Sequence, residues 1–217
     1  MVNNMEIFDA LRAAANPEKA VSMKAYMRGQ FEYLGVATPL RRQLSRDFIK
    51  AQKAVDWGFV FACWELAERE FQYLAIDCLD KLKTLLLPKD IANLQKLITT
   101  KSWWDTVDGL DVIVGDIALR YAEVNNTLLQ WSSAENIWLR RTAIDHQLLR
   151  KEKTDTALLE RIILNNLGQS EFFINKAIGW SMREYSKTDP AWVRAFMEKH
   201  KDKLAPLSIR EGGKYVF

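Results

Sequence analysis

The tripeptides Ala75-Ile76-Asp77, Gly109-Leu110-Asp111, Ala143-Ile144-Asp145 and Ala177-Ile178-Gly179 decide the fold of this chain. Each begins 34 residues after the one before it, as in 109 − 75. A small residue followed by a large aliphatic one is what close stacking of every second helix requires. A regular period of this length is typical of helical solenoids. The sequence therefore predicts an all-α repeat protein with a concave groove.

The kind of repeat follows from a pattern that is missing. A period of 34 residues is also that of tetratricopeptide repeats, but their Trp-x2-Leu-Gly-x2-Tyr pattern does not occur. A HEAT-like stack of helix pairs is therefore predicted. With only 9 Gly and 5 Pro, and with Ala, Leu, Lys, Glu and Arg abundant, the composition favours helices throughout. Apolar periodicity predicts helices at 5–15, 17–29, 40–51, 55–66, 69–83, 88–99, 103–122, 124–131, 135–150, 154–166, 171–186 and 190–200.

The chain is predicted to form a single domain over residues 1–217. Residues 1–52 are expected to be a divergent cap of helices, and residues 53–200 to form the helix-pair repeats. Asn16-Pro17 and Thr38-Pro39 are predicted start signals for two cap helices. No linker or low-complexity tract interrupts the pattern.

Charge and cysteine content limit the classes of protein without choosing one. A net charge of +3 is compatible with a nucleic-acid partner but does not establish one. Cys63 and Cys78 have no spacing suited to a zinc site, so reduced and partly buried thiols are expected. No signal peptide or membrane-spanning stretch is recognisable, so a cytoplasmic location is expected.

The repeat frame predicts where unusual side chains point. At ~100° per residue from Ala75, Gly109, Ala143 and Ala177, the aliphatic row lies near ~100°. In that frame Trp104 lies near ~220°, Asp108 near ~260°, Arg141 near ~160° and Trp180 near ~300°. These four side chains are therefore expected to converge on one groove from three consecutive repeats.

Each of these residues also has a purely structural interpretation. Tryptophan is usually buried, so six of the eight are expected in the core: Trp57, Trp64, Trp103, Trp131, Trp138 and Trp192. Asp108 could be a structural acid paired with Arg141. Arg41-Arg42 and Arg150-Lys151 are expected to form solvated faces, unless they border the groove and contact phosphates.

Several reaction types lack their sequence signals. There is no Gly-rich phosphate loop, no Gly-x-Ser-x-Gly elbow and no His-Glu-x-x-His pattern. The two histidines, His146 and His200, have no spacing suited to a metal site or a triad. What remains is a site with one acid, aromatic faces and an arginine, which suits a cationic transition state.

Four motifs resemble the AlkD-type DNA alkylation repair glycosylases, which have HEAT-like repeats. They are Lys-Ser-Trp-Trp-Asp-Thr-Val-Asp (101–108), Asn-Ile-Trp-Leu-Arg-Arg (136–141), Phe-Phe-Ile-Asn-Lys-Ala-Ile-Gly-Trp (172–180) and Arg-Glu-Tyr (183–185). Shorter similarities at 16–20, 26–27, 38–42, 68–72 and 205–208 extend the resemblance over almost the whole chain. The ending at 212–217 departs from the family, where a longer terminal helix is usual.

The resemblance implies an enzyme that removes cationic N3- or N7-alkylated purines from duplex DNA and begins base excision repair. It implies that Asp108 is the catalytic carboxylate, that Trp104 and Trp180 pack against the lesion's deoxyribose, and that Arg141 binds phosphate. Tyr26, Lys101 and Arg183 are the other expected DNA contacts. No cofactor, metal or membrane partner is expected. The protein is expected to be a monomer that associates with the nucleoid when bound to DNA.

An alternative from another class stays open. A HEAT-like scaffold could bind branched DNA or a protein helix in its groove without catalysis. A structural pairing of Asp108 with Arg141 would favour that alternative.

Overall fold

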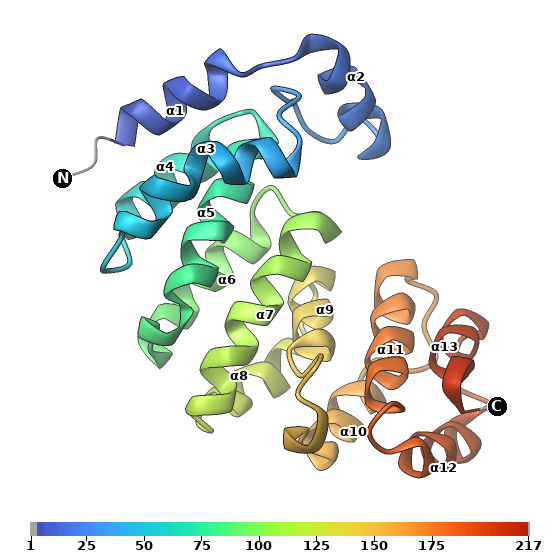
Figure 1. The fold of residues 1–217 in the computed structure, drawn as a ribbon. Coiled ribbons are helices and arrows are strands. Elements are labelled where there is room, and N and C mark those ends of the chain that lie inside the picture. The colour runs from blue at the N-terminus through green and yellow to red at the C-terminus, as the bar shows by residue number, and fades with distance from the viewer. Residues whose placement is uncertain (1–3, 217) are drawn as a thin grey trace. The chain divides into compact units, whose positions relative to one another are not determined.

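A computed structural model describes residues 4–216, and among these every regular element is a helix (Figure 1). The prediction of an all-α helical-repeat fold is therefore confirmed. The chain divides into two compact units, Met1–Leu86 and Leu87–Phe217. The predicted single domain, with a cap that ends near residue 52, stays a prediction.

The helices match the predicted periodicity closely. Unit 1 contains α1 (Asn4–Ala13), α2 (Pro17–Tyr26), α3 (Thr38–Ala51), α4 (Trp57–Glu65), α5 (Arg69–Leu82) and the 3-10 turn η1 (Lys83–Leu85). Unit 2 contains η2 (Pro88–Asp90), α6 (Ile91–Thr99), α7 (Trp104–Arg120), α8 (Val124–Trp131), α9 (Ile137–Asp145), η3 (Lys151–Lys153), α10 (Thr156–Leu164), α11 (Phe172–Tyr185), α12 (Pro190–His200), α13 (Pro206–Gly212) and η4 (Gly213–Tyr215).

Several predicted boundaries were wrong and one helix was missed. The helix predicted at 17–29 ends at Tyr26, because Arg28 and Gly29 have positive φ values of 55° and 72°. The helix in the segment predicted at 135–150 ends at Asp145 and a turn follows, and it cannot extend to residue 150 because Leu149 has a positive φ of 65°. Thr38 lies inside α3 rather than capping it. Helix α13 was not predicted at all, since seven residues are too few to show a helical period.

A single carboxylate organises the loop between α2 and α3 in unit 1. The buried side chain of Glu70 accepts hydrogen bonds from the backbone N–H groups of Leu34, Gly35 and Val36, at 2.9 to 3.0 Å. Gly35 has a φ of 84°, and a Cβ there would lie 2.0 Å from the Asn16 carbonyl oxygen. Only glycine fits this position without strain. The Asn16 cap is confirmed, because its side chain accepts a bond from the N–H of Lys19.

The arginine pair of α3 does not form a solvated face. Arg41 is buried and donates to Asp77 of α5 through Nε at 3.2 Å and Nη2 at 3.0 Å. Arg42 is exposed and lies 3.7 Å from the same carboxylate. The expectation was therefore wrong for Arg41, whose charge joins two helices of unit 1.

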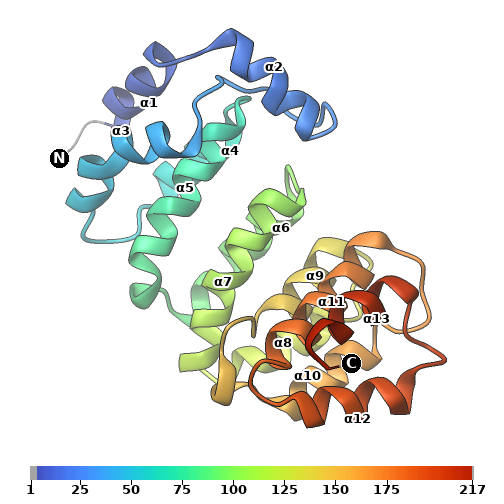
Figure 2. The same cartoon turned by 45° about the vertical axis from the view of Figure 1, so that its right-hand side comes forward.

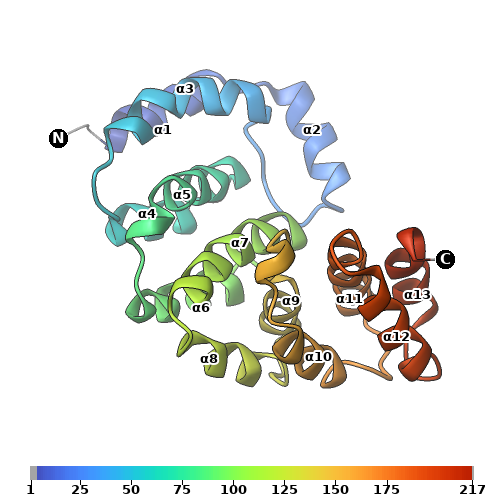
Figure 3. The ribbon, with the colours of Figure 1, turned by 60° about the horizontal axis from the view of Figure 1, so that its bottom comes forward.

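In unit 2, α7, α9 and α11 lie side by side, as Figures 2 and 3 show. Leu110, Ile144 and Ile178 are fully buried in this stack, as the repeat predicts. The equivalent Ile76 in unit 1 is half-buried. Three of the predicted core tryptophans (Trp64, Trp131, Trp138) are buried and three (Trp57, Trp103, Trp192) are half-buried. Both cysteines are buried free thiols, more deeply buried than predicted.

Glycine allows α7 to approach the end of α9 at close distance. A Cβ on residue 115 would lie 2.1 Å from the carbonyl oxygen of His146, closer than any real contact. The carbonyl of Gly115 also accepts a hydrogen bond from Arg150 Nη2 at 2.6 Å. The two helices therefore meet at backbone distance. In the described part of the chain, no helix is long and apolar enough to cross a membrane.

Gly115→Ala is expected to destabilise the protein by about 1–3 kcal/mol, because the added methyl group forces α7 away from the His146 backbone. The measurement is the free energy of unfolding in urea. Gly58→Ala is the matched control, since Gly58 is also helical but its Cβ would meet only a side-chain atom of Asp56, at 3.2 Å. There, the better helix propensity of alanine should offset any loss. Equal destabilisation of both variants would contradict the close approach at Gly115.

Candidate functional site

Three predicted site residues meet in unit 2, one from each helix of the α7, α9 and α11 stack. Arg141 of α9 donates to both carboxylate oxygens of Asp108 on α7, from Nε at 2.7 Å and from Nη2 at 2.9 Å. Its guanidinium carbon also lies 5.4 Å from the ring centre of Trp180 on α11. The expected convergence of these side chains from consecutive repeats is therefore present.

The start of α7 positions its two site residues. Trp103 is extended, with φ −159°, and the helix begins at Trp104. Asp108 comes four residues later and therefore lies on the same helical face as Trp104. Asp105 stands in the first turn, where a negative charge is favoured by the helix dipole. Trp104 and Asp108 are both half-buried, so the site reaches the surface.

Arg141 is buried, and each of its three nitrogens donates a hydrogen bond. Its residue is only 1% exposed, and its third donor, Nη1, bonds the carbonyl oxygen of Phe173 at 2.7 Å. This is a bidentate, charge-assisted pair, the strongest form of the interaction. A direct contact of Arg141 with phosphate stays a prediction, and the 2% exposure of its side chain limits such a contact.

Asp108 is less buried than its partner. Its side chain keeps 23% exposure while that of Arg141 keeps 2%. One edge of the carboxylate is thus held by the arginine, and part of the group remains accessible to a ligand. The pairing with Arg141 favours a structural role for Asp108. The exposed part of its carboxylate is also compatible with a catalytic role, which can be tested.

Two further carboxyls lie beside the pair. One oxygen each from Asp108, Asp111 and Asp145 lies within 4.8 Å of the others. Asp145 Oδ2 is 3.7 Å from Arg141 Nη2. Three carboxylates are a donor set that hard divalent cations accept, but here the guanidinium of Arg141 already lies among them. These buried acids were not predicted as site residues, although Asp111 and Asp145 belong to the repeat tripeptides.

Burial shifts the pKa values of the cluster. Burial raises the pKa of Asp108 above its ordinary value, although the hydrogen bonds from Arg141 oppose this shift. Burial raises the pKa of Asp145 to about 7, and that of Asp111 well above its ordinary range. Burial alone would lower the pKa of Arg141, but the surrounding carboxylates raise it, so the arginine stays charged.

Trp180 lies beside two cations. Besides Arg141, the Lys176 Nζ lies 5.5 Å from its ring centre. Lys176 in turn donates to Glu211 of α13 at 2.7 Å, and Arg183 donates to the same carboxylate at 3.1 Å. A Cβ on Gly179 would lie 2.6 Å from the Cβ of Glu211, so α13 packs directly on α11. The helix that sequence analysis missed therefore positions two cations of the site.

The remaining predicted contacts are distributed over both units. Tyr26 is 72% exposed at the end of α2 in unit 1. Lys101 is half-buried just before α7 and has a φ of 49°. The indoles of Trp103 and Trp138 pack against Phe173 at ring-centre distances of 5.1 and 5.0 Å. This aromatic cluster supports the residue whose carbonyl binds Arg141.

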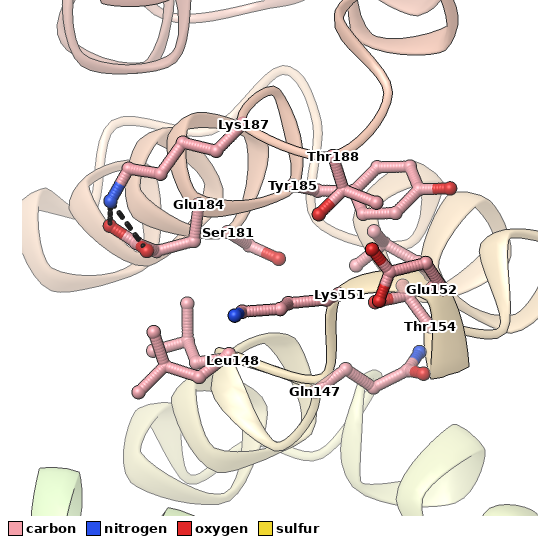
Figure 4. Close-up of a pocket in the computed structure, with 12 residues that line it drawn as sticks. Gln147, Leu148, Lys151, Glu152, Thr154, Ser181, Glu184, Tyr185, Lys187 and Thr188 are labelled. Atoms are coloured by element: carbon pink, nitrogen blue, oxygen red, sulfur yellow. Dashed lines mark hydrogen bonds and ion pairs between the residues drawn. The ribbon is translucent and has the colours of Figure 1, made fainter.

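A separate cavity of about 360 Å³ lies between the end of α11 and the loop after α9. Figure 4 shows Lys151 extending into it, with the ion pair of Lys187 and Glu184 at its edge. None of the predicted site residues lines it. Opposite charges lie close together there, so the cavity has no clear preference for an anion or a cation.

The comparisons with known proteins concern the family and the fold of the chain. The family model described as "DNA alkylation repair enzyme" matches residues 7–216. A solved structure of a predicted DNA alkylation repair enzyme from Enterococcus faecalis is similar, with 37% identity and a TM-score of 0.87. The match covers 93% of this chain and 96% of that chain. No curated protein matches the chain.

Arg141→Met is expected to cost about 3–5 kcal/mol of unfolding free energy, because it leaves buried carboxylates without their cation. Arg120→Met is the control on the neighbouring helix α7. Arg120 pairs with Asp116 at 2.8 Å in a more exposed setting and should cost at most about 1 kcal/mol. Urea unfolding of both variants measures the difference. A loss at Arg141 no larger than at Arg120 would refute the structural importance of the buried pair.

Proposed function

The chain belongs to the family of DNA alkylation repair enzymes, and on that premise we propose that it is a DNA glycosylase for cationic alkylated purines. The proposed substrates are N3- and N7-alkylated purines in duplex DNA, and the proposed reaction is hydrolysis of the N-glycosidic bond. The observation that supports this most is the half-buried carboxylate of Asp108. Arg141 holds one edge of it, and the indole of Trp180 lies against that same arginine.

The charge of the substrate determines what the site must supply. An alkylated purine already carries a positive charge, so it leaves as a neutral base when the bond from C1′ to the base nitrogen breaks. The bonding electrons go to the base, and positive charge develops on the sugar. No general acid is needed for this departure.

Asp108 is proposed to stabilise that developing charge. A fixed carboxylate in a partly dry site acts on a cation more strongly than it would in water. The bidentate bonds from Arg141 keep the carboxylate ionised and hold its plane, so little reorganisation is needed. The faces of Trp104 and Trp180 are proposed to add cation–π attraction to the sugar. Water oriented by Asp108 then attacks C1′, and its proton is released to solvent.

The DNA contacts are part of the same proposal. Tyr26, Lys101 and Arg183 are proposed to bind the backbone, and Arg183 would exchange its bond with Glu211 for a phosphate. Arg141 is proposed to act mainly by holding Asp108, since its side chain is buried and bonds both oxygens of that carboxylate. A monomeric, cytoplasmic protein that needs no cofactor or metal is proposed with it.

The second candidate is a scaffold that binds branched DNA or a protein helix without catalysis. The pair between Asp108 and Arg141 is the observation that favours it, because such a pair explains the acid without any chemistry. A base-release assay on duplex DNA with N7-methylguanine separates the two candidates. Release of free base by the purified protein supports the glycosylase, and binding without release supports the scaffold.

Asp108→Asn is expected to lower the single-turnover excision rate ~100-fold or more, equivalent to ~3 kcal/mol, with DNA affinity nearly unchanged. The amide keeps the shape of the side chain but removes the charge that acts on the transition state. Rates are compared at a temperature where circular dichroism shows both proteins folded.

Asp116→Asn is the matched control for this measurement. Asp116 lies on the same helix, its side chain has the same 23% exposure, and it also pairs with an arginine. Its replacement should leave the excision rate unchanged. If a folded Asp108→Asn protein excised bases at the rate of the control, Asp108 would not be the catalytic carboxylate.

A further inference from the structure

Asp111 and Asp145 lie beside the pair of Asp108 and Arg141, yet the proposed reaction uses neither. Asp111 comes three residues after Asp108 on α7, and Asp145 four residues after Arg141 on α9. Each therefore shares a helix face with one member of the pair. Their carboxyl groups, together with that of Asp108, form a single cluster within 4.8 Å.

Both side chains are buried without hydrogen bonds. Asp111 and Asp145 are each 1% exposed, and none of their four carboxylate oxygens has a hydrogen-bond partner. The contact of Asp145 with Arg141, at 3.7 Å, is longer than a hydrogen bond. An ionised carboxylate in such surroundings is strongly disfavoured. Something must therefore compensate these two groups.

The charges of the cluster show what is missing. If all three carboxyls were ionised, the single arginine would leave two negative charges uncompensated in a buried site. Asp108 is the member that stays ionised, because both of its oxygens accept bonds from Arg141. Two carboxylates that share a buried site cannot both ionise at neutral pH. A protonated carboxyl also gains an O–H donor for its neighbour.

We propose that Asp111 and Asp145 share one proton and form a carboxyl–carboxylate pair that links α7 to α9 beneath the site. The hydrogen bond requires two oxygens that now lie within 4.8 Å of each other to approach to about 2.6 Å. Because the shared proton reduces the negative charge on Asp145, this residue competes less with Asp108 for the guanidinium of Arg141. Both acids are positioning residues, because they act on the substrate only through Arg141 and Asp108.

The pKa directions agree with this geometry. Burial raises the pKa of both carboxyls, that of Asp145 to about 7. The charged groups that act most strongly on the pair are Asp108 from α7 and Arg141 from α9. An acid whose pKa is higher in the folded than in the unfolded protein contributes stability that is fully present below the unfolded pKa. This stability is lost as the pH rises through the folded pKa. For Asp145 the window runs from the ordinary value of 3.8 to about 7, and for Asp111 it begins at the same value and extends well above it.

The first test compares the wild-type protein with the double variant Asp111→Asn/Asp145→Asn, which cannot bind the proton. Between about pH 4 and pH 7, the unfolding constant of the wild type should rise about tenfold per pH unit relative to the variant. The neighbouring His146 titrates in both proteins, so its effect cancels in the comparison. Asp116→Asn, the control, should keep the wild-type dependence. Identical pH dependence in the wild type and the double variant would overturn the shared proton.

Infrared spectroscopy provides an independent readout if the double variant does not fold. The wild type at neutral pH should show the C=O stretch of a protonated carboxyl, shifted in heavy water, and the absence of that band would overturn the proposal. A melting temperature raised by Mg²⁺ or Ca²⁺ in the wild type but not in the double variant would also overturn it, since a cation would then compensate the charges.

The last test rests on the proposed function. In the wild type, loss of the shared proton frees Asp145 to compete for Arg141, so the single-turnover excision rate should fall as the pH rises above about 7. In Asp145→Asn the rate should no longer fall, and in Asp116→Asn it should fall as in the wild type. An equal fall in all three would overturn the positioning role. If the wild type releases no base at all, the proposed function fails, while the unfolding and infrared measurements still decide the shared proton.

Discussion

A buried guanidinium is the constraint on which the site in unit 2 depends. The charge of Arg141 cannot be left inside a protein without partners, so the helices around it must each supply one. Helix α7 supplies the carboxylate of Asp108, α9 supplies Asp145, and α11 supplies the carbonyl of Phe173. The relative register of three helices is therefore tied to one side chain.

The same pairing decides what kind of chemistry the site suits. A carboxylate bonded to arginine on one edge stays ionised and fixed, so it is poorly suited to donate a proton. It is better suited to a substrate that brings its own positive charge and needs only electrostatic stabilisation. The pairing also weakens the field of the carboxylate. Because 23% of the Asp108 side chain remains exposed, Arg141 can hold the carboxylate while a substrate still reaches it. The structural and the catalytic interpretations are therefore compatible.

The repeat places aspartates at equivalent positions in three helices, but their surroundings differ. Asp77 in unit 1 is partly exposed and binds Arg41, which gives it a complete salt bridge. Asp111 and Asp145 in unit 2 are buried and have no hydrogen bonds. The same position of the repeat therefore forms an ordinary salt bridge between helices in one repeat. In two other repeats it holds a carboxyl group whose pKa is raised. The difference lies in whether an arginine donates hydrogen bonds to the carboxylate.

By itself, the sequence determined the helical class, the 34-residue period and the arc on which Trp104, Asp108, Arg141 and Trp180 lie, because periodicity and helical geometry are local properties. It did not reveal α13, whose seven residues are too short for a period, or the early end of α9, which depends on the positive φ of Leu149. Only the tertiary structure decided that Arg141 bonds Asp108 rather than facing outward, and that Asp111 and Asp145 are buried beside them. Pairing and desolvation depend on distances between helices, and these distances are set by side chains far apart in the chain.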